Sequence, residues 1–496
     1  MKKKKELIII LGSLLVVVLS VSIAYFTTTI NSKNSNVSTS SAELKIVFTS
    51  GTGTIAGSEI EPGWSSGTST FTVKNESKDT YKYNIVIKDL INTFVTTGYL
   101  QYKITSTDGG YNMSDFKDVP KSTSAKDKVL AYSVEIAKGA THTYSVEFRY
   151  LNSTTVNQNE DMGKKLSGTL YIEKGTLPKL SEKLLADNPT IKTRTSFNTT
   201  FTETNTGTLY KATESIVNSP AKDVYYFAGD AKNNWVKFAG FYWRIIRTNH
   251  DGSVRLLYSG TSPDTTSGYI VKSLFNNYTN DPMYVGYMYG TSGTLASNRT
   301  NENNSTIKRV IDNWYSRNLS SYTKYISTEA VYCNDRKAPS YNASSFFYYY
   351  VYTRLNAGNP TYDCEDAKDA FSGSNAEAKL TYPIGLMTAD EITYAGGYKN
   401  TSLTSPYAWF YLNSAGGSIT GAEYWWLLSP NCWNGSNAAF SWLVYDSNNR
   451  PGYLDSGSLI TTYGVRPAIS LKTCALWTSG NGAPETPYEI STISGC

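Results

Sequence analysis

Apolar and polar residues alternate with a period of two over residues 44–173. The alternation is seen in six short runs: Phe71–Val73, Tyr83–Ile87, Tyr102–Ile104, Tyr132–Ile136, Tyr144–Tyr150 and Leu170–Ile172. Turn-forming residues separate these runs, for example Pro62–Gly63 and Asp108–Gly110. Short alternating runs with regular turns and no helical period predict an all-β antiparallel sandwich of about 130 residues.

A different pattern precedes this domain. Residues 7–26 carry no charge and follow four lysines, Lys2 to Lys5. A run of this length can cross a bilayer core of roughly 30 Å as a helix, with the lysines on the cytoplasmic side. Ser22–Ala24 also offers a small-x-small cleavage site. Residues 1–26 are therefore expected to be a signal peptide or a membrane anchor, and residues 27–43 a polar stalk.

The pattern changes again after residue 173. Leu180–Leu185 predicts one short helix, and the Thr- and Asn-rich remainder of residues 174–221 reads as a linker. Residues 222–474 then mix strands with helices, and residues 475–496 are expected to be a tail. The strand predictions in this part are residues 224–229, 235–247, 254–258, 424–428, 439–445 and 465–471.

Two helices are predicted within residues 222–474. Ile307, Ile311 and Tyr315 form an apolar stripe over residues 305–319, and Ser305 is a suitable N-cap. The second helix begins after Thr388 with Glu391 completing a capping box, and it ends at Gly396–Gly397. The predicted fold is therefore multidomain: an apolar helix, an all-β sandwich and a C-terminal α+β domain.

Charge and composition exclude several classes of function. The formal charge is +5, and loss of residues 1–24 would leave 42 basic against 40 acidic residues. A nearly neutral body has no bulk attraction for nucleic acid, so no nucleic-acid partner is expected. The chain has two histidines, His142 and His250, in no zinc-hydrolase or catalytic-triad spacing. Its 40 tyrosines are typical of extracellular β-proteins that bind through amphipathic surfaces, or simply of strand propensity.

All five cysteines follow residue 330, and none forms a Cys-x-x-Cys pair. In an oxidising compartment they are expected to form disulfides. The pairing nearest in sequence joins Cys333 to Cys364 and Cys474 to Cys496, which leaves Cys432 as a free and inert thiol. Other connectivities stay open, because sequence alone does not determine them.

Two resemblances accompany these patterns. The apolar run ending in Ala24–Thr27, then Glu61–Gly63, Phe71–Asn75 and Tyr81–Asp89 resemble the camelysin-type matrix-fibre proteins of Gram-positive bacteria. This resemblance covers roughly 130 residues and implies an exported sandwich. The protease activity described for camelysin is not expected here, because no metal-ligand motif is present.

The second resemblance spans about 250 residues of the C-terminal part. Its motifs, in order, are Trp243–Arg247, Ser305–Tyr315, Cys333–Arg336, Tyr382–Ile392, Trp425–Pro430 and Gly464–Leu471. Together they look like an uncharacterised domain of surface proteins from gut Gram-positive bacteria. That domain is similar in layout to the C-type-lectin-like and formylglycine-generating-enzyme fold. The resemblance implies a fold family and no particular activity.

Candidate ligand-binding residues lie in two segments of that domain. Residues 429–437 and 446–455 combine aromatic rings with amides and carboxylates, which is the chemistry of sugar sites, sometimes with Ca²⁺. The candidates are Asn431, Trp433, Asn434, Asp446, Asn448 and Asp455. The same residue types also form ordinary turns. No cofactor is required by any motif, and calcium enters only through this analogy.

Three further features have structural interpretations. Trp425 and Trp426 are adjacent, so at least one is expected in the core. The aromatic run Phe346–Tyr352 is expected to be a half-buried strand, or else a surface contact patch. Arg466 is expected to pair with a buried acid.

These observations lead to one functional expectation with two alternatives. The chain is predicted to be an exported, extracellular or membrane-anchored cell-surface protein with no catalytic activity, which binds carbohydrate or another surface protein. The first alternative is a structural subunit of a matrix fibre. The second is an enzyme on a formylglycine-generating-enzyme-like fold. Cys432 and Cys474 do not match that family's copper-binding cysteine motif, so no catalytic residue is assigned.

Overall fold

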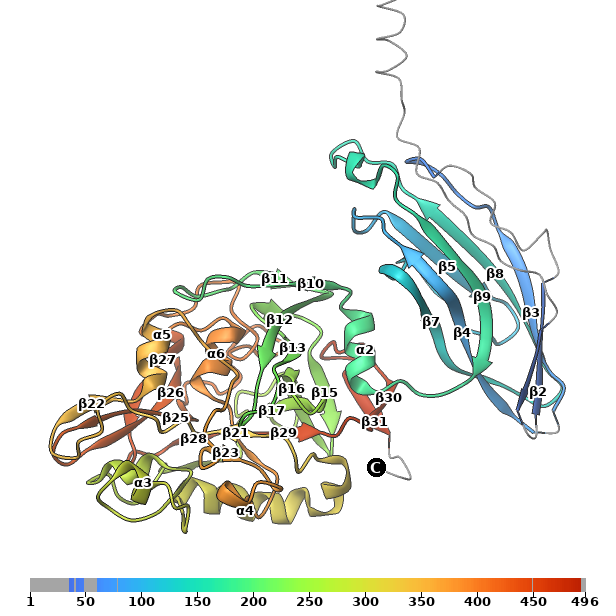
Figure 1. Ribbon diagram of the computed structural model, residues 1–496. Helices are drawn as coiled ribbons and strands as arrows, with labels where there is room; N and C mark the ends of the chain where they lie inside the picture. Colours follow the sequence, from blue (N-terminus) through green and yellow to red (C-terminus); the bar gives the residue numbers. More distant parts are fainter. Residues whose placement is uncertain (1–34, 40–41, 49–59, 78, 448, 492–496) are drawn as a thin grey trace, which may run out of the picture. The chain divides into compact units, whose positions relative to one another are not determined.

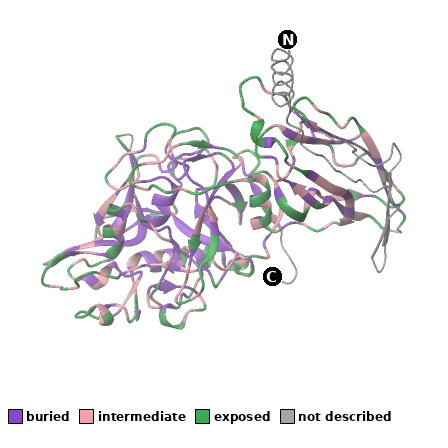
Figure 2. Ribbon diagram, turned by 45° about the horizontal axis from the view of Figure 1, so that its top comes forward, coloured by how far each residue is buried: buried purple, intermediate pink, exposed green. Residues whose placement is uncertain are grey.

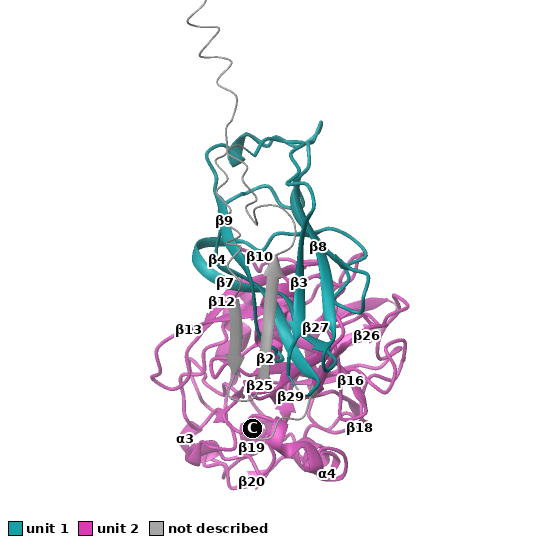
Figure 3. Cartoon of the chain, turned by 90° about the vertical axis from the view of Figure 1, so that its right-hand side faces the viewer, with its two compact units in different colours: residues 1–177 teal, residues 178–496 magenta. Residues whose placement is uncertain are grey.

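A computed structural model describes residues 35–39, 42–48, 60–77, 79–447 and 449–491 (Figure 1). The expected signal or anchor segment, residues 1–26, lies outside this range. Among the described residues no helix is long and apolar enough to cross a membrane. The chain divides into two compact units, Met1–Leu177 and Pro178–Cys496 (Figure 3). Of the described residues, 39% are in strands and 13% in helices, so this part of the chain is predominantly β.

The first unit is built from two antiparallel sheets around one core. The six-stranded sheet has the order β1 (Ser35–Thr39), β2 (Ala42–Phe48), β3 (Ser69–Asn75), β8 (Thr141–Tyr150), β5 (Leu100–Ser106) and β6 (Lys117–Asp118). The three-stranded sheet has the order β7 (Ser122–Ile136), β4 (Tyr81–Asn92) and β9 (Leu166–Lys174). Phe71, Tyr144 and Ile172 meet in the core, which confirms the sandwich prediction. A short 3₁₀ turn, η1 (Asn159–Asp161), precedes β9.

Alternation explains most of this core. Strand β8 buries every second residue, with His142, Tyr144 and Val146 facing inward. Strand β4 differs, because Tyr83 to Ile87 are all buried. β4 is the central strand of its sheet and pairs with β7 and β9 through several register shifts, which interrupt the simple two-residue period.

The second unit contains a ten-stranded sheet and a six-stranded sheet. The first follows the order β10 (Thr190–Lys192), β12 (Thr208–Glu214), β13 (Lys222–Tyr226), β16 (Phe241–Thr248), β15 (Trp235–Phe238), β31 (Tyr488–Ser491) and β30 (Leu476–Ser479). It is extended by β17 (Val254–Tyr258), β29 (Pro467–Leu471) and β24 (Gly385–Leu386). The second sheet follows the order β18 (Val271–Ser273), β28 (Tyr463–Val465), β25 (Trp425–Asn434), β26 (Ala439–Ser447) and β27 (Arg450–Ser458), with β22 (Phe346–Tyr348) beside β25.

Short helices and small strand pairs complete this unit. The helices are α2 (Leu180–Asp187), α3 (Leu295–Asn298), α4 (Thr306–Asn318), α5 (Tyr350–Asn356) and α6 (Ala389–Ala395). The 3₁₀ turns are η2 (Pro282–Val285), η3 (Ser320–Tyr325) and η4 (Ala376–Ala378). The small pairs are β11 (Thr204–Asn205) with β14 (Asp230–Ala231), β19 (Met288–Tyr289) with β20 (Asn303–Asn304), and β21 (Tyr332–Cys333) with β23 (Ala370–Phe371).

The helix predictions are confirmed down to their caps. Ser305 accepts a hydrogen bond from the backbone N–H of Lys308 and starts α4. Thr388 and Glu391 form the predicted capping box of α6. That helix ends at Gly396, whose φ of 122° is unfavourable for other residues.

Three predicted boundaries are wrong. Residues 35–39 and 42–43, expected to belong to the polar stalk, contribute β1 and the start of β2, and β2 pairs with β3 in the six-stranded sheet. Residues 178–221, expected to be part of a linker, contribute α2, β10 and β12, and β12 pairs with β13 inside the large sheet. Residues 475–496, expected to be a tail, contribute β30 and β31, and β31 pairs with β15. Neither of the last two segments shows a clean apolar alternation: β12 buries the polar residues Thr208 and Glu214 together with Leu209 and Tyr210.

The core of the second unit is rich in large aromatic side chains. Buried residues run through the interior of the second unit (Figure 2). Trp425 and Trp426 are both fully buried, and they lie on the central strand β25. Arg466 is also buried, and it donates to the carbonyl oxygens of Tyr258 and Phe410, at 3.2 and 2.8 Å. No carboxylate among the described residues forms an ion pair with it. Burial lowers the pKa of Arg466, and the negative charge of Asp446 partly opposes this effect. The direct acid partner expected for Arg466 is therefore replaced by backbone carbonyls.

The aromatic run 346–352 only partly follows its strand prediction. Residues 346–348 form β22, and α5 starts at Tyr350. Phe347, Tyr349 and Val351 are buried, so the alternation is kept across the strand–helix junction. Phe346 and Tyr350 stay exposed at 54% and 38%. The run is thus half-buried as expected, although half of it is helical.

Candidate binding surface

The structure does not bring the six candidate ligand residues together. Trp433 is buried, and its Nε1 donates to the carbonyl of Ala343 at 2.8 Å. Asp446 is fully buried, and its Oδ2 accepts from Thr420 Oγ1 at 2.8 Å and from Trp425 Nε1 at 2.9 Å. Asn431 is 3% exposed. These three residues belong to the core of the second unit. Asn431 and Trp433 lie on β25, which is buried on both faces, and Asp446 is buried on the neighbouring strand β26.

The other three candidates have different positions. Asn434 is exposed, and its Oδ1 accepts from the N–H groups of residues 436, 437 and 438, so it closes the β25–β26 turn. Asn448 lies outside the described residues. Asp455 is partly exposed on β27, opposite Leu443 of β26. Among these six, Asp455 has the most suitable position for a ligand.

Asp455 lies near four partly exposed tyrosines, which we call the tyrosine cluster: Tyr424, Tyr445, Tyr453 and Tyr463. The ring centroids of Tyr424 and Tyr445 are 4.1 Å apart, and those of Tyr445 and Tyr453 are 5.7 Å apart. Tyr463 lies 5.8 Å from Tyr424. Burial, followed by the charge of Asp455, raises the pKa of Tyr445 to about 12, so this hydroxyl stays protonated at neutral pH.

Strand pairing explains why the cluster forms. Tyr445 and Tyr453 are direct cross-strand partners of β26 and β27, where side chains on one face are closest. A bulge at Tyr445–Asp446 turns Asp446 into the core while Tyr445 keeps its place. Gly452 has a φ of 59°, and a Cβ there would come within 2.3 Å of Leu403 Cδ1. The sequence therefore holds the β26–β27 hairpin in one conformation.

Arg450 adds a cation at the end of this hairpin. Its guanidinium carbon is 5.0 Å from the ring centroid of Tyr453 and 5.8 Å from that of Tyr445. It is exposed, and no carboxylate within the described part of the chain forms an ion pair with it. The surface thus offers ring faces, phenolic hydroxyls, one carboxylate and one guanidinium. Sequence reasoning missed Tyr424 and Tyr463 because they are two among 40 tyrosines and lie outside both candidate segments, residues 429–437 and 446–455.

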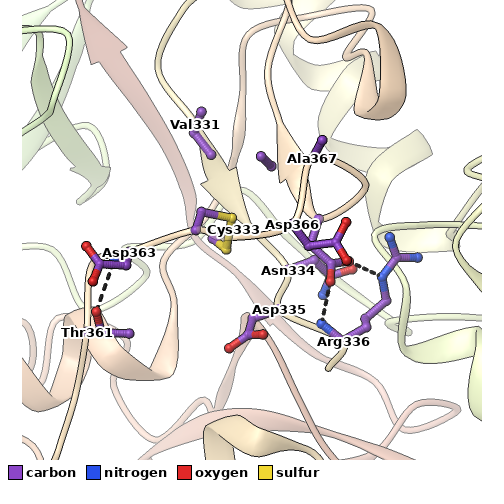
Figure 4. Close-up of a disulfide and its surroundings, with 12 residues drawn as sticks. Val331, Cys333, Asn334, Asp335, Arg336, Thr361, Asp363, Asp366 and Ala367 are labelled. Carbon is purple, nitrogen blue, oxygen red and sulfur yellow. Dashed lines mark hydrogen bonds and ion pairs between the residues drawn. A yellow bond between two sulfur atoms is a disulfide. The ribbon is translucent and has the colours of Figure 1, made fainter. Parts of the chain in front are cut away.

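A group of charged side chains surrounds the Cys333–Cys364 disulfide (Figure 4). Cys333 and Cys364 are bonded as predicted, and Cys432 is a free thiol as predicted. Burial raises the pKa of the Cys432 thiol to about 12, which makes it a poor nucleophile. The expected link from Cys474 to Cys496 involves a residue outside the described range, so it stays a prediction.

Beside this disulfide lies a small charged pocket with about 20 Å³ of free space, which is enough for about one water molecule. In its interior Glu391 Oε1 accepts from Arg247 at 3.0 Å and from Arg255 at 2.9 Å. Arg247 also donates to Glu214 at 2.8 Å. Burial alone would raise the pKa of Glu391, but the two arginines lower it overall.

Arg354 lies on another side of the pocket and holds two carboxylates. It donates to both oxygens of Asp390, at 2.8 and 2.7 Å, and to Asp335 at 2.5 Å. Burial alone would lower the pKa of Arg354. The two carboxylates have the larger effect, so the pKa of Arg354 is raised. Burial also raises the pKa of Asp335 against the opposing effect of Arg354. Clustered shifts of this kind occur at active sites and in structural ion networks alike.

The geometry favours the structural interpretation of the charged pocket. Its described lining contains no histidine, and four of its carboxylates, those of Glu214, Asp335, Asp390 and Glu391, each accept a hydrogen bond from an arginine. Among the residues that the structure describes, no group of three His, Cys, Asp or Glu side chains is arranged to hold a metal ion. Comparison with protein-family models, curated proteins and solved structures finds no match to this chain.

Proposed function

We propose that this chain is an exported bacterial cell-surface protein whose second unit is a non-catalytic module that binds carbohydrate. The observation that carries the proposal is the tyrosine cluster, flanked by Arg450 and Asp455. Sugars present apolar C–H faces that pack against aromatic rings, and hydroxyl groups that hydrogen-bond to carboxylates and guanidinium groups. Partly exposed rings held by strand pairing offer this contact at low entropic cost, because their rotamers are already restricted.

The export part of the proposal rests on residues 2–26. Four lysines before an uncharged run of twenty residues orient the chain with its remainder outside the cytoplasm. Protease treatment of intact cells should release both units. Protection of the second unit in that experiment would contradict the surface location.

The binding part is tested by isothermal titration calorimetry against a panel of neutral, acidic and amino-sugar oligosaccharides. Tyr453→Ala should weaken binding at least fivefold, since a central aromatic contact contributes more than about 1 kcal/mol. Tyr278→Ala is the matched control, because Tyr278 is 58% exposed and outside the tyrosine cluster. No binding by the parent protein, or equal loss in both variants, would refute the proposed site.

The same purified protein distinguishes the binding module from a fibre subunit. A binding module remains monomeric at micromolar concentration, whereas a fibre subunit polymerises through strand exchange. Light scattering of the full chain over several days reports the difference. Sedimentable polymers would favour the fibre role over the binding role.

A further inference from the structure

Two tyrosines at the junction of β22 and α5 are stacked face to face. The ring centroids of Tyr348 and Tyr352 are 3.6 Å apart, and the ring planes differ by 9°. The two hydroxyl groups are close enough to interact: after burial, Tyr352 helps to raise the pKa of Tyr348 to about 12. Parallel rings whose hydroxyls also lie near each other place the carbons next to those hydroxyls on facing edges. Both side chains are partly exposed to solvent.

Other close tyrosine pairs in the described part of the chain lack one of these features. Tyr362 and Tyr394 are stacked at 4.0 Å and 20°, but both are buried. Tyr424 and Tyr445 are partly exposed at 4.1 Å, but their planes are tilted by 45°. The Tyr348–Tyr352 pair combines parallel stacking, neighbouring hydroxyls and access from solvent.

We propose that Tyr348 and Tyr352 form a site of oxidative cross-linking, in which a carbon–carbon bond joins the two rings at positions ortho to their hydroxyls. Each phenol first loses one electron and one proton to give a phenoxyl radical. The two radicals combine at their ortho carbons, and each ring then shifts its ortho hydrogen to oxygen and becomes aromatic again. One hydrogen peroxide, acting through a haem peroxidase, accepts the two electrons and two protons and becomes two water molecules.

The position of the pair gives the cross-link a structural consequence. Tyr348 ends β22, and Tyr352 lies in the first turns of α5 (Figure 1). Tyr352 also stacks on Trp442 of β26 at 6.0 Å. The junction lies within the segment that the Cys333–Cys364 disulfide closes. A bond between the rings would fix the angle between strand and helix and hold the exposed edge of the six-stranded sheet in place.

The thiol of Cys432 competes with this reaction. Cys432 is the direct cross-strand partner of Tyr348. A thiol can give a hydrogen atom to a phenoxyl radical, which restores the phenol and leaves the unpaired electron on sulfur as a thiyl radical. Replacement by serine removes this competing donor without changing the strand pairing. The Cys432→Ser protein should therefore cross-link in higher yield than the parent protein.

The test treats the full chain at low micromolar concentration with horseradish peroxidase and one equivalent of hydrogen peroxide. Trypsin releases residues 338–354 as one peptide, which contains both tyrosines. The expected product of this peptide is lighter by two hydrogen atoms and gives no backbone fragments between residues 348 and 352. Tyr348→Phe should reduce its yield at least tenfold, whereas Tyr350→Phe, which replaces an exposed tyrosine outside the stack, should leave it unchanged.

Three results would overturn the proposal. The first is an unmodified 338–354 peptide under conditions that give dityrosine elsewhere in the chain. The second is an equal yield of the lighter peptide from Tyr348→Phe. The third is dityrosine found mainly in covalent dimers, since the stack predicts a bond within one molecule. Circular dichroism of each variant before oxidation shows that it is folded.

Discussion

Replacement of Glu391 by glutamine tests how much the charged pocket contributes to the stability of the second unit. Glu391 is 1% exposed, and its Oε1 holds both Arg247 and Arg255. Removing one partner of a buried ion pair costs about 3–5 kcal/mol, because the opposite charge stays buried without compensation. Arg247 keeps its contact with Glu214, so Arg255 alone loses its carboxylate. The expected loss in the free energy of unfolding is therefore near the lower limit, about 3 kcal/mol.

The assay is urea unfolding followed by tryptophan fluorescence. Trp64 is in the first unit, and the other nine of the ten tryptophans, from Trp235 onward, are in the second, so the signal reports mainly on the second unit. Glu377→Gln is the control, since Glu377 is exposed and its change should stay within about 0.5 kcal/mol. A loss below about 1 kcal/mol for Glu391→Gln would refute the idea that the network carries this stability.

The pH dependence gives an independent check of the same substitution. The pKa of Glu391 is lowered in the folded protein from an ordinary value of 4.5. An acid whose pKa is lower in the folded than in the unfolded state stabilises the fold above its unfolded-state pKa. This stabilisation is lost as the pH falls through its folded-state pKa. The difference in the free energy of unfolding between the parent protein and Glu391→Gln should therefore be constant above pH 4.5 and shrink below it. A difference that grows on acidification would contradict the assigned charge.

The remaining predictions concern other parts of the fold. Burial raises the pKa of Asp446 from 3.8 to about 7, so Asp446 stays protonated to a higher pH in the folded state than in the unfolded state. Stability of the second unit should fall by about 2 kcal/mol from pH 5.5 to 8, and Asp446→Asn should abolish this slope in urea titrations. Replacing Cys333 and Cys364 together by serine should cost about 4 kcal/mol in calorimetry, because the bridge closes a 31-residue separation. Phe71→Ala should cost about 3–5 kcal/mol in the first unit only, measured by calorimetry, and leave the tryptophan transition unchanged; a shift of both transitions would show that the two cores are coupled.

Local patterns in the sequence determined the strands of the sandwich and the caps of the helices. The two-residue period of Tyr144–Tyr150 reflects one buried and one outer face, which a single strand encodes by itself. Ser305, Thr388 and Glu391 bond to backbone groups within three residues, so their roles are also local. The Cys333–Cys364 pairing could be predicted for a related reason, since Cys364 is the cysteine nearest to Cys333 and closes the shortest loop open to it.

The candidate site was decided by tertiary structure. The segment 446–455 looked like a ligand loop because of its amides and carboxylates, yet it forms a hairpin whose bulge sends Asp446 into the core beside Trp425. Tyr424, just before β25, and Tyr463, on β28, reach the same surface although neither β25 nor β28 is adjacent to β27 in the sheet. Such contacts depend on strand order and register, and no local period encodes them.

The same reason explains the wrong boundaries. Residues 208–214 and 488–491 have little apolar pattern of their own, and they become strands because β13 and β15 offer unpaired backbone edges. The sequence by itself determined which segments could be strands or helices, because side-chain periodicity and capping are local properties. The tertiary structure alone decided which edges pair, which polar residues are buried and which rings share a surface, because those outcomes depend on strand order and register, and some join residues about 250 positions apart, as β15 with β31.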